Sequence, residues 1–283
     1  MILGTGKYAF KMIDGWGQGP EGRAPGGRAC GVAVDSRDRV HVLVRTSTPV
    51  LVYDTSGRFL NGWGEGLFAE VHGIWISPDD MIYICDAGGH TMRKFTNDGK
   101  LLRTWGTPNQ PAEPGKPFNG TQDVILTDSG EMFVADGYNN CMHKFSADGE
   151  WLFSWGEPGN GPSQFSLPHA VDIDHEGRLL VADRENNRLQ FFDMGGRYLT
   201  EWPVPKPNDV YVAKDGMIWI AEEEKRKVSV YNDAGEQLAR FGERGQGPGQ
   251  FKSFIHTLWP DSHGDLYIVG MMRDNDMYKL ERA

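Results

Sequence analysis

The stretch Phe165–Gln190, FSLPHAVDIDHEGRLLVADRENNRLQ, shows the pattern from which the fold of this 283-residue chain can be predicted. Two short apolar runs, AVDID and RLLVAD, flank the turn HEG, and another alternating run begins at Arg188. Short runs of this kind, separated by polar turns, are typical of antiparallel strands joined as hairpins. No helical spacing of apolar residues competes with this pattern. The stretch therefore predicts consecutive strands of one antiparallel sheet.

The same unit recurs along almost the whole chain. Its hairpin segment reappears as VHVLVRTSTPVLVYDTSG, IYICDAGGHTMRKFTNDG, MFVADGYNNCMHKFSADG, IWIAEEEKRKVSVYNDAG and LYIVGMMRDNDMYKLERA. Most copies follow another short run, such as GVAVD or GIWIS, and precede one that ends in Trp-Gly or Phe-Gly. Four strands in roughly 40 to 50 residues, repeated in this way, are the pattern of a propeller blade. We therefore expect an all-β chain forming one six-bladed β-propeller, with blades over residues 28–64, 68–107, 118–157, 165–202, 207–242 and 251–283.

The sixth copy of the unit ends without a fourth strand. The N-terminal segment at residues 8–17, YAFKMIDGWG, has the missing form, including the final Trp-Gly. We expect this segment to pair onto the last blade and close the ring. Closure is favourable because it removes sheet edges that separate blades would expose.

Counting along the repeat defines one position that faces the central channel. Asp86, Asp136 and Asp183 share a site in three blades, and the residue fourteen positions earlier begins the innermost strand. We call that earlier residue the axial residue, because innermost strands line the channel of a propeller. In blade order, the axial residues are Cys30, His72, Gln122, His169, Asn208 and His256.

Histidine occupies the axial position in blades two, four and six. A single histidine at a strand start is usually a core or surface residue, and we expect this of the other histidines. Three histidines in alternate blades instead converge on the axis with near three-fold symmetry. Neutral imidazoles in this arrangement bind a divalent metal and leave one position open, and three histidines suit zinc. The pattern predicts a zinc site formed by His72, His169 and His256.

Arginine occupies the position after the shared aspartate site in blades one and four, as Arg45 and Arg184. A guanidinium group is a planar fork suited to carboxylates, so we expect the two arginines to bind a substrate anion. The alternative is that Arg184 pairs with a neighbouring acid and Arg45 only lies along the surface.

Tyr138 lies one residue further along the repeat, in blade three. It either transfers a proton beside the metal or packs in the core.

Composition narrows the choice of partners and compartment. The formal net charge of −10 argues against nucleic acid and anionic membrane surfaces as partners. No apolar run is long enough for a transmembrane helix, and the N-terminus does not read as a signal peptide. The three cysteines, Cys30, Cys85 and Cys141, lack metal-type spacing. We therefore expect a reducing, cytoplasmic location and a monomer.

The repeat as a whole resembles the NHL family of β-propellers. The segments FNGTQDVILTDSGEMFVADGYNN and GQFKSFIH, together with the stretch quoted first, are similar to the peptidyl-α-hydroxyglycine α-amidating lyase domain of peptidylglycine α-amidating enzymes. The similarity covers nearly the whole chain and is strongest over residues 118–192. Its most specific motifs are DGY, PH and ADREN-R.

This resemblance implies an enzyme that cleaves the N–Cα bond of a C-terminal α-hydroxyglycine, giving a peptide amide and glyoxylate. It implies that the three axial histidines bind a catalytic zinc. It also implies that two arginines and a tyrosine of the active site correspond to Arg45, Arg184 and Tyr138. The residues selected by counting along the repeat and those selected by the resemblance are the same.

The resemblance further implies a structural calcium in the channel. The backbone carbonyl groups of Val32 and Ile74 match two of its ligands, but the aspartate expected directly after the third histidine is Thr257. Secreted members of the family also carry disulfides, whose second cysteines are replaced here by Asn139 and Phe191. These departures put a calcium site in question and agree with the expected reducing compartment.

The sequence thus favours a zinc-dependent carbon–nitrogen lyase acting on a small molecule or peptide that carries a carboxylate. One alternative is a zinc hydrolase or lyase that acts on another small carboxylated substrate. Another is a non-catalytic NHL propeller that serves as an interaction scaffold, which would give no reason for histidines in alternate blades.

Overall fold

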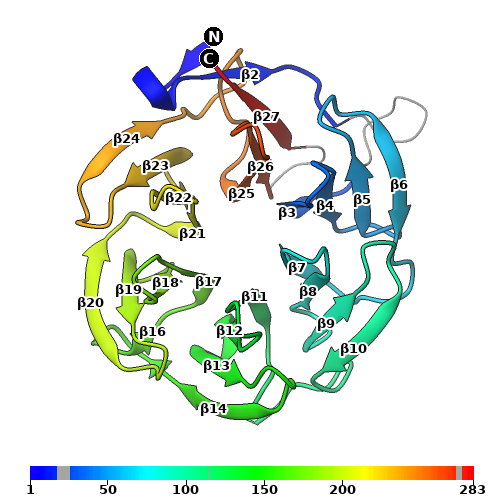
Figure 1. The fold of residues 1–283 in the computed structure, drawn as a ribbon, viewed down its shortest axis with the longest axis vertical. Helices are drawn as coiled ribbons and strands as arrows, with labels where there is room; N and C mark the ends of the chain where they lie inside the picture. Colours follow the sequence, from blue (N-terminus) through cyan, green and yellow to red (C-terminus); the bar gives the residue numbers. More distant parts are fainter. Residues whose placement is uncertain (18–25, 114, 272–275) are drawn as a thin grey trace.

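The computed structural model describes residues 1–17, 26–113, 115–271 and 276–283. Six antiparallel sheets surround a central axis, with the first strand of each blade innermost and the last at the rim (Figure 1). The predicted fold class, an all-β six-bladed propeller, is confirmed.

The first three blades each contain four strands in sequence order from the axis outward. Blade one comprises β3 (Ala29–Val34), β4 (Val40–Val44), β5 (Val50–Tyr53) and β6 (Phe59–Trp63). Blade two comprises β7 (Val71–Ile76), β8 (Ile82–Asp86), β9 (Thr91–Phe95) and β10 (Leu101–Trp105). Blade three comprises β11 (Thr121–Leu126), β12 (Met132–Asp136), β13 (Cys141–Phe145) and β14 (Trp151–Trp155).

Blades four and five follow the same plan. Blade four comprises β17 (Pro168–Ile173), β18 (Leu179–Asp183), β19 (Arg188–Phe192) and β20 (Tyr198–Pro203). Blade five comprises β21 (Pro207–Val212), β22 (Ile218–Glu222), β23 (Lys227–Tyr231) and β24 (Gln237–Phe241). The short strands β15 (Glu157–Pro158) and β16 (Gln164–Phe165) form a parallel pair between blades three and four, and single 3-10 turns lie at η1 (Gly6–Tyr8) and η3 (Gly137–Asn139).

The N-terminal strand closes the ring, as the sequence predicts. Blade six comprises β25 (Ile255–Pro260), β26 (Leu266–Gly270), β27 (Met277–Arg282) and the N-terminal β2 (Phe10–Ile13). Strand β2 pairs with β27 in antiparallel register, with Phe10 opposite Arg282. A two-residue strand that the sequence did not reveal, β1 (Ile2–Leu3), adds a fifth strand outside β2. The two ends of the chain therefore lie together on one blade (Figure 1).

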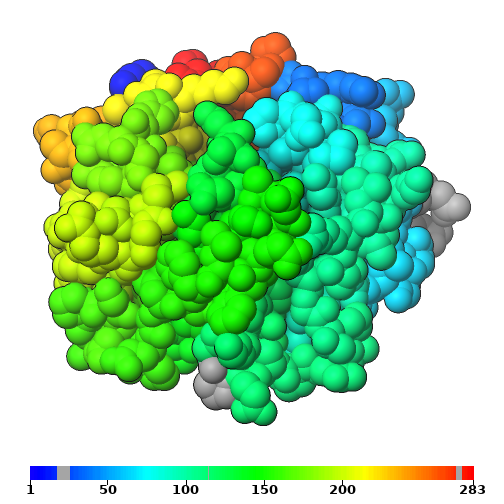
Figure 2. Space-filling view, turned by 60° about the horizontal axis from the view of Figure 1, so that its bottom comes forward, coloured from blue at the N-terminus to red at the C-terminus, as the bar shows by residue number. Residues whose placement is uncertain are grey.

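Apolar side chains fill the seams between neighbouring blades. The second strands are buried on both faces, which explains why apolar residues dominate them, as in VHVLV of β4. Outer strands such as β10, LLRTW, are largely exposed. Six buried clusters occur among the described residues, and each joins two adjacent blades. In the space-filling view, blade three (green) lies directly against blades two and four (Figure 2). This packing fixes the positions of the inner strands around the channel.

In the part of the chain that the structure describes, no helix is both long and apolar enough to cross a membrane.

Candidate metal centre

A β-bulge in each inner strand includes the axial residue. The pairing between first and second strands shifts register at the same place in all six blades, for example between Pro168 and Ala170 around His169. A bulged residue is not held in the ladder, and its side chain is turned out of the sheet. The axial side chains can therefore point toward the channel rather than into the seams between blades.

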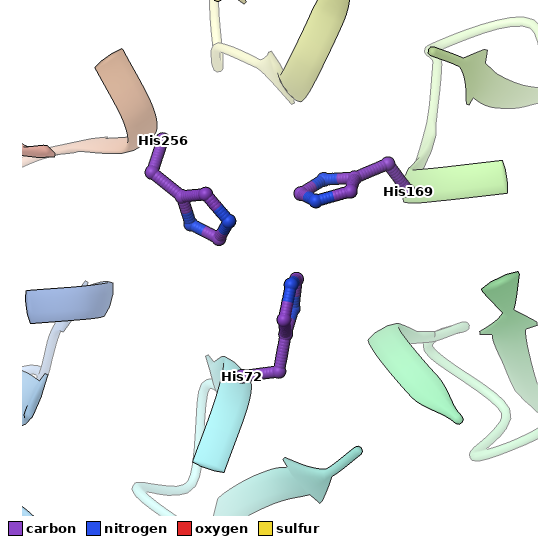
Figure 3. Close-up of side chains that lie close together, drawn as sticks. All are labelled: His72, His169 and His256. Atoms are coloured by element: carbon purple, nitrogen blue, oxygen red, sulfur yellow. The ribbon is translucent and has the colours of Figure 1, made fainter. Parts of the chain in front are cut away.

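The three axial histidines meet at the axis, as the sequence predicts they would. Their ring centroids lie 4.8 Å apart for His72 and His169, 4.8 Å for His72 and His256, and 4.9 Å for His169 and His256. The rings come from β7, β17 and β25 and face one another across the channel (Figure 3). All three side chains are buried. Each offers a ring nitrogen within 4.8 Å of the other two.

Each histidine is held by a hydrogen bond to the next blade. The acceptors are backbone carbonyl oxygens of the intervening axial residues: His72 Nδ1 to Gln122 at 3.1 Å, His169 Nδ1 to Asn208 at 2.6 Å, and His256 Nδ1 to Cys30 at 2.7 Å. A carbonyl oxygen can only accept, so Nδ1 carries the proton in every ring. The lone pair of each neutral imidazole is consequently on Nε2. Metal-binding histidines are commonly oriented in this way.

Burial keeps the three imidazoles neutral. Desolvation is the main cause that lowers the pKa of His256, to about 3, and the positive charges of Arg45 and Arg184 act in the same direction. Burial also holds the pKa values of His72 and His169 well below the usual range for histidine. A neutral ring is the form that binds a metal ion.

The donor set fits zinc. Among the described residues, the buried Nε2 of His256 has no hydrogen-bond partner. A buried polar atom without a partner is unfavourable, and a cation at the axis would relieve that cost. Three neutral nitrogen donors with one remaining position are the ligand pattern of a catalytic zinc site. The residues that would hold the ion are His72, His169 and His256.

The two predicted arginines lie close to the histidines, but each also has an acidic partner. Arg45 Nη1 lies 2.5 Å from Glu70, and Arg45 Nε donates to the Val71 carbonyl at 3.3 Å. Arg184 Nη2 lies 3.0 Å from Glu185. The pairing considered for Arg184 as an alternative therefore exists, and Arg45 is paired as well. Both positive charges still lower the pKa of His256.

Tyr138 lies in the η3 turn between β12 and β13 of blade three, with 59% of its surface exposed. Its ring packs over Gly120, where an added Cβ would lie 2.2 Å from Tyr138 Cδ2. In the described ranges, no hydrogen bond or ring contact joins Tyr138 to the three histidines. The alternative of a core-packing tyrosine is wrong, because the side chain is exposed.

Three carboxylates that the sequence reading did not single out line the channel beside the histidines. Asp123, Asp172 and Asp209 border the same cavity of about 180 Å³ as His72 and His169. Each carboxylate accepts a backbone N–H from the inner strand of the next blade, at 3.0, 2.7 and 2.8 Å. Burial raises the pKa of Asp123 and of Asp172 to about 7. The feature of the sequence that could have identified these carboxylates is an acidic residue on an otherwise apolar inner strand.

The residues matched to the calcium ligands border this cavity too. Val32, Ile74 and Thr257 line it. In the described part of the chain, Thr257 Oγ1 is buried without a hydrogen-bond partner. The cavity thus contains oxygen atoms of the kind that calcium binds, although the position of the family's aspartate is a threonine.

A second group of metal-type side chains has a structural explanation. Asp136, Cys141 and His143 are buried together. His143 Nε2 is 3.0 Å from Asp136, and its Nδ1 is 2.6 Å from Ser154 Oγ, so both ring nitrogens have partners. Blade two repeats the contact as Arg93 with Asp86. This contact recurs with the repeat and ties the third strand to the acid that ends the second.

Comparison with known proteins supports the fold and the repeat type. The family model described as a 6-bladed beta-propeller matches residues 117–214. NHL repeat-containing protein 3 of Mus musculus is 36% identical over 180 residues, which cover 58% of this chain and 51% of that protein. Peptidyl-alpha-hydroxyglycine alpha-amidating lyase 1 of Drosophila melanogaster is 35% identical over 93 residues, 32% of this chain and 17% of that protein.

A solved streptogramin B lyase structure has the same fold, with a TM-score of 0.65 and 13% identity, covering 100% of this chain and 99% of that one. The chain spans about half the length of the mouse NHL protein that it matches, and much less of the Drosophila lyase. The comparisons therefore show a six-bladed propeller with NHL-repeat relatives.

Proposed function

We propose that this chain is a zinc-dependent lyase that cleaves the N–Cα bond of an α-hydroxyglycine-type carbinolamide, giving an amide and glyoxylate. The observation that carries the proposal is the set of three axial histidines, each bonded through Nδ1 to the next blade, with Nε2 left for a metal. The partial similarity to an amidating lyase supports the choice of reaction.

The reaction needs no net change in protons. The substrate has the form R–CO–NH–CH(OH)–COO⁻. Loss of the hydroxyl proton lets the carbinol oxygen form a carbonyl group, and the electron pair of the C–N bond passes to the amide nitrogen. That nitrogen takes up one proton to give R–CO–NH₂, and the carbon leaves as glyoxylate.

The chain supplies groups for each part of this step. Bound zinc would act as a Lewis acid on the carbinol oxygen. Arg45 and Arg184 bind the substrate carboxylate and offset the charge that develops as the bond breaks. Tyr138 accepts the hydroxyl proton at Oη and returns it to the amide nitrogen. Because Tyr138 is exposed, its side chain is accessible to a substrate that arrives from solvent.

The glutamate partners of the arginines bear on substrate binding. The Glu70 side chain is 46% exposed, whereas that of Arg45 is 16% exposed. An exposed carboxylate can turn into solvent when a substrate carboxylate takes its place, because surface ion pairs contribute little stability. We infer that Glu70 and Glu185 hold the two guanidinium groups in position until the substrate binds.

The test is metal analysis beside a glyoxylate assay with α-hydroxyhippurate. The zinc-loaded protein should contain one zinc per chain and release glyoxylate, and His169→Ala should lose both properties. The matched control is His175→Ala, an exposed histidine in the same blade, which should retain both. A protein without zinc after zinc-replete purification would overturn the proposal and favour a scaffold. Undiminished turnover in His169→Ala would overturn the role of the three histidines in the reaction.

A further test addresses the proton transfer. Tyr138→Phe should bind zinc normally and lower kcat on the order of 10²-fold. Equal kcat values for this variant and the parent protein would remove Tyr138 from the mechanism while leaving the metal centre in place.

A further inference from the structure

A second cavity lies beside Arg45, between blades one and two. It has a volume of about 340 Å³, and its lining includes Arg28, Arg45, Thr46, Phe68, Glu70 and Val71. Arg45 links it to the axial residues, because its guanidinium group also donates to the carbonyl of Val71, the residue directly before His72. We call this cavity the side groove. A substrate whose carboxylate meets Arg45 would have the groove directly beside it.

The side groove carries positive charge in an acidic protein. Arg45 is paired with Glu70 at 2.5 Å. Arg28 is exposed, and no acidic side chain in residues 1–17, 26–113, 115–271 or 276–283 pairs with it. The net charge of the whole chain is −10, so an unpaired arginine next to the site is a local exception. It attracts an anion rather than a cation.

The chain holds Arg28 close to the axis. The Arg45 N–H donates to the Arg28 carbonyl at 2.9 Å, which fixes the two backbones side by side. Gly27 permits this approach: its φ is +76°, and a Cβ there would lie 2.3 Å from Thr46. Arg28 also lies only two residues before the axial Cys30 in the chain.

The remaining walls are partly apolar and leave room. Val44, Pro49, Phe68 and Val71 form the apolar part, and Thr46 and Ser47 are polar residues of the lining. A Cβ added at Gly66 would meet no atom within 4 Å, so the groove is open at that point. An apolar wall with a cation at its edge fits an organic group that ends in an anion.

We propose that the side groove binds the amide half of the substrate and selects acyl or peptidyl groups that carry a second carboxylate, which Arg28 binds. This inference rests on the proposed lyase function for the first carboxylate and the reacting carbon. It adds a substrate class: α-hydroxyglycine conjugates with an acidic, partly apolar acyl group.

The experiment compares two substrates of nearly equal size. N-(4-carboxybenzoyl)-α-hydroxyglycine carries the second carboxylate, and the 4-carbamoylbenzoyl analogue is its neutral match. We expect the parent protein to prefer the acidic substrate by about tenfold in kcat/KM, the value of one charge-assisted contact. Arg28→Ala should abolish the preference, and Arg28→Lys should restore part of it. Arg37→Ala removes an exposed arginine at the far end of the same blade and should leave the preference unchanged.

A binding measurement separates this inference from the lyase proposal. Calorimetry with the products 4-carboxybenzamide and benzamide needs no turnover. The acidic amide should bind about tenfold more tightly to the parent protein, and Arg28→Ala should remove that difference. Equal affinities, or a difference that survives Arg28→Ala, would overturn the side-groove proposal. If neither substrate released glyoxylate, the lyase proposal would be overturned. The binding measurement would then be the test of the side-groove proposal.

Discussion

The neutral state of the axial histidines can be tested by replacing one of them with a group that does not titrate. In His256→Asn, the asparagine Nδ2 stands near the position of the imidazole Nδ1 and can still donate to the Cys30 carbonyl. The variant therefore keeps the 2.7 Å hydrogen bond of the parent protein but removes the ionisable ring. The two proteins should differ in how their stability depends on pH when no metal is bound.

The direction and size of this pH effect on stability follow from the depressed pKa of His256. Histidine in the unfolded chain has a pKa of about 6.5, whereas burial lowers that of His256 to about 3 in the folded protein. Below pH 6.5 the unfolded chain binds a proton that the folded protein does not, so stability falls as pH falls. Between pH 7 and pH 5, this one group lowers the free energy of unfolding by about 2 kcal/mol.

The assay is urea unfolding in excess chelator at pH 7, 6 and 5. The parent protein should lose about 2 kcal/mol more than His256→Asn across this range. His175→Asn, at an exposed histidine, should lose as much as the parent. If the parent and His256→Asn lost stability equally, the folded protein would be taking up a proton at His256. The rings would then not be the neutral ligands that a zinc centre needs.

Three further outcomes follow from the site and its frame. In metal-free protein, Asp172→Asn should raise the free energy of unfolding at pH 8 but not at pH 4. The reason is that the pKa of Asp172 in the folded protein is raised to about 7, so its charged form becomes costly as pH rises. The gain should stay below about 4 kcal/mol, because the substitution weakens one backbone contact. Gly73→Ala should weaken zinc binding tenfold or more in a competition assay, because a Cβ at Gly73 would lie 2.2 Å from the Gln122 oxygen that orients His72. Gly195→Ala, at an exposed glycine, should leave zinc binding unchanged. Phe10→Ala, in the closing strand, should cost about 3 to 5 kcal/mol in thermal or urea unfolding, and the exposed Lys11→Ala almost nothing; equal effects would mean that closure does not depend on this buried ring.

The sequence was sufficient to predict those residues and strands whose positions follow from the repeat alone. Counting back from Asp183 identified His169 as axial, because every blade places the same position of the repeat at the start of its inner strand. The closing strand at Phe10 was predictable for the same reason. By contrast, the two-residue strand at Ile2 has no pattern long enough to read.

Contacts between blades were not predictable, because they join residues far apart in the sequence. Nothing near His256 in the sequence indicates that its Nδ1 donates to Cys30, 226 positions away. The pairing of Arg45 with Glu70 likewise depends on how blade two lies against blade one. The position of Tyr138 depends on a glycine, Gly120, that leaves space for its ring. Such details decide the electrostatics of the site even though the repeat decides its members.

The axial residues of the intervening blades hold the three histidines in position. Each histidine takes the backbone carbonyl of the next blade as its acceptor, and the side chains there turn to other backbone oxygens. Gln122 Nε2 donates to Gly120 at 2.8 Å, Asn208 Nδ2 to Ile255 at 2.8 Å, and Cys30 Sγ to Val71 at 3.2 Å. Three blades thus provide the axial imidazole rings, and three provide the backbone carbonyl groups that orient them.

This division makes the proposed metal centre depend on closure of the ring. Two of the orienting hydrogen bonds join blades that follow each other in the chain, from His72 to Gln122 and from His169 to Asn208. The third, from His256 to Cys30, joins the last blade to the first. The last blade is completed by Phe10–Ile13, so the strand that closes the propeller also holds β27 and the inner strands behind it. A weakened closing strand should therefore loosen His256 before the other two ligands, which ties the proposed zinc affinity to the stability of the seam.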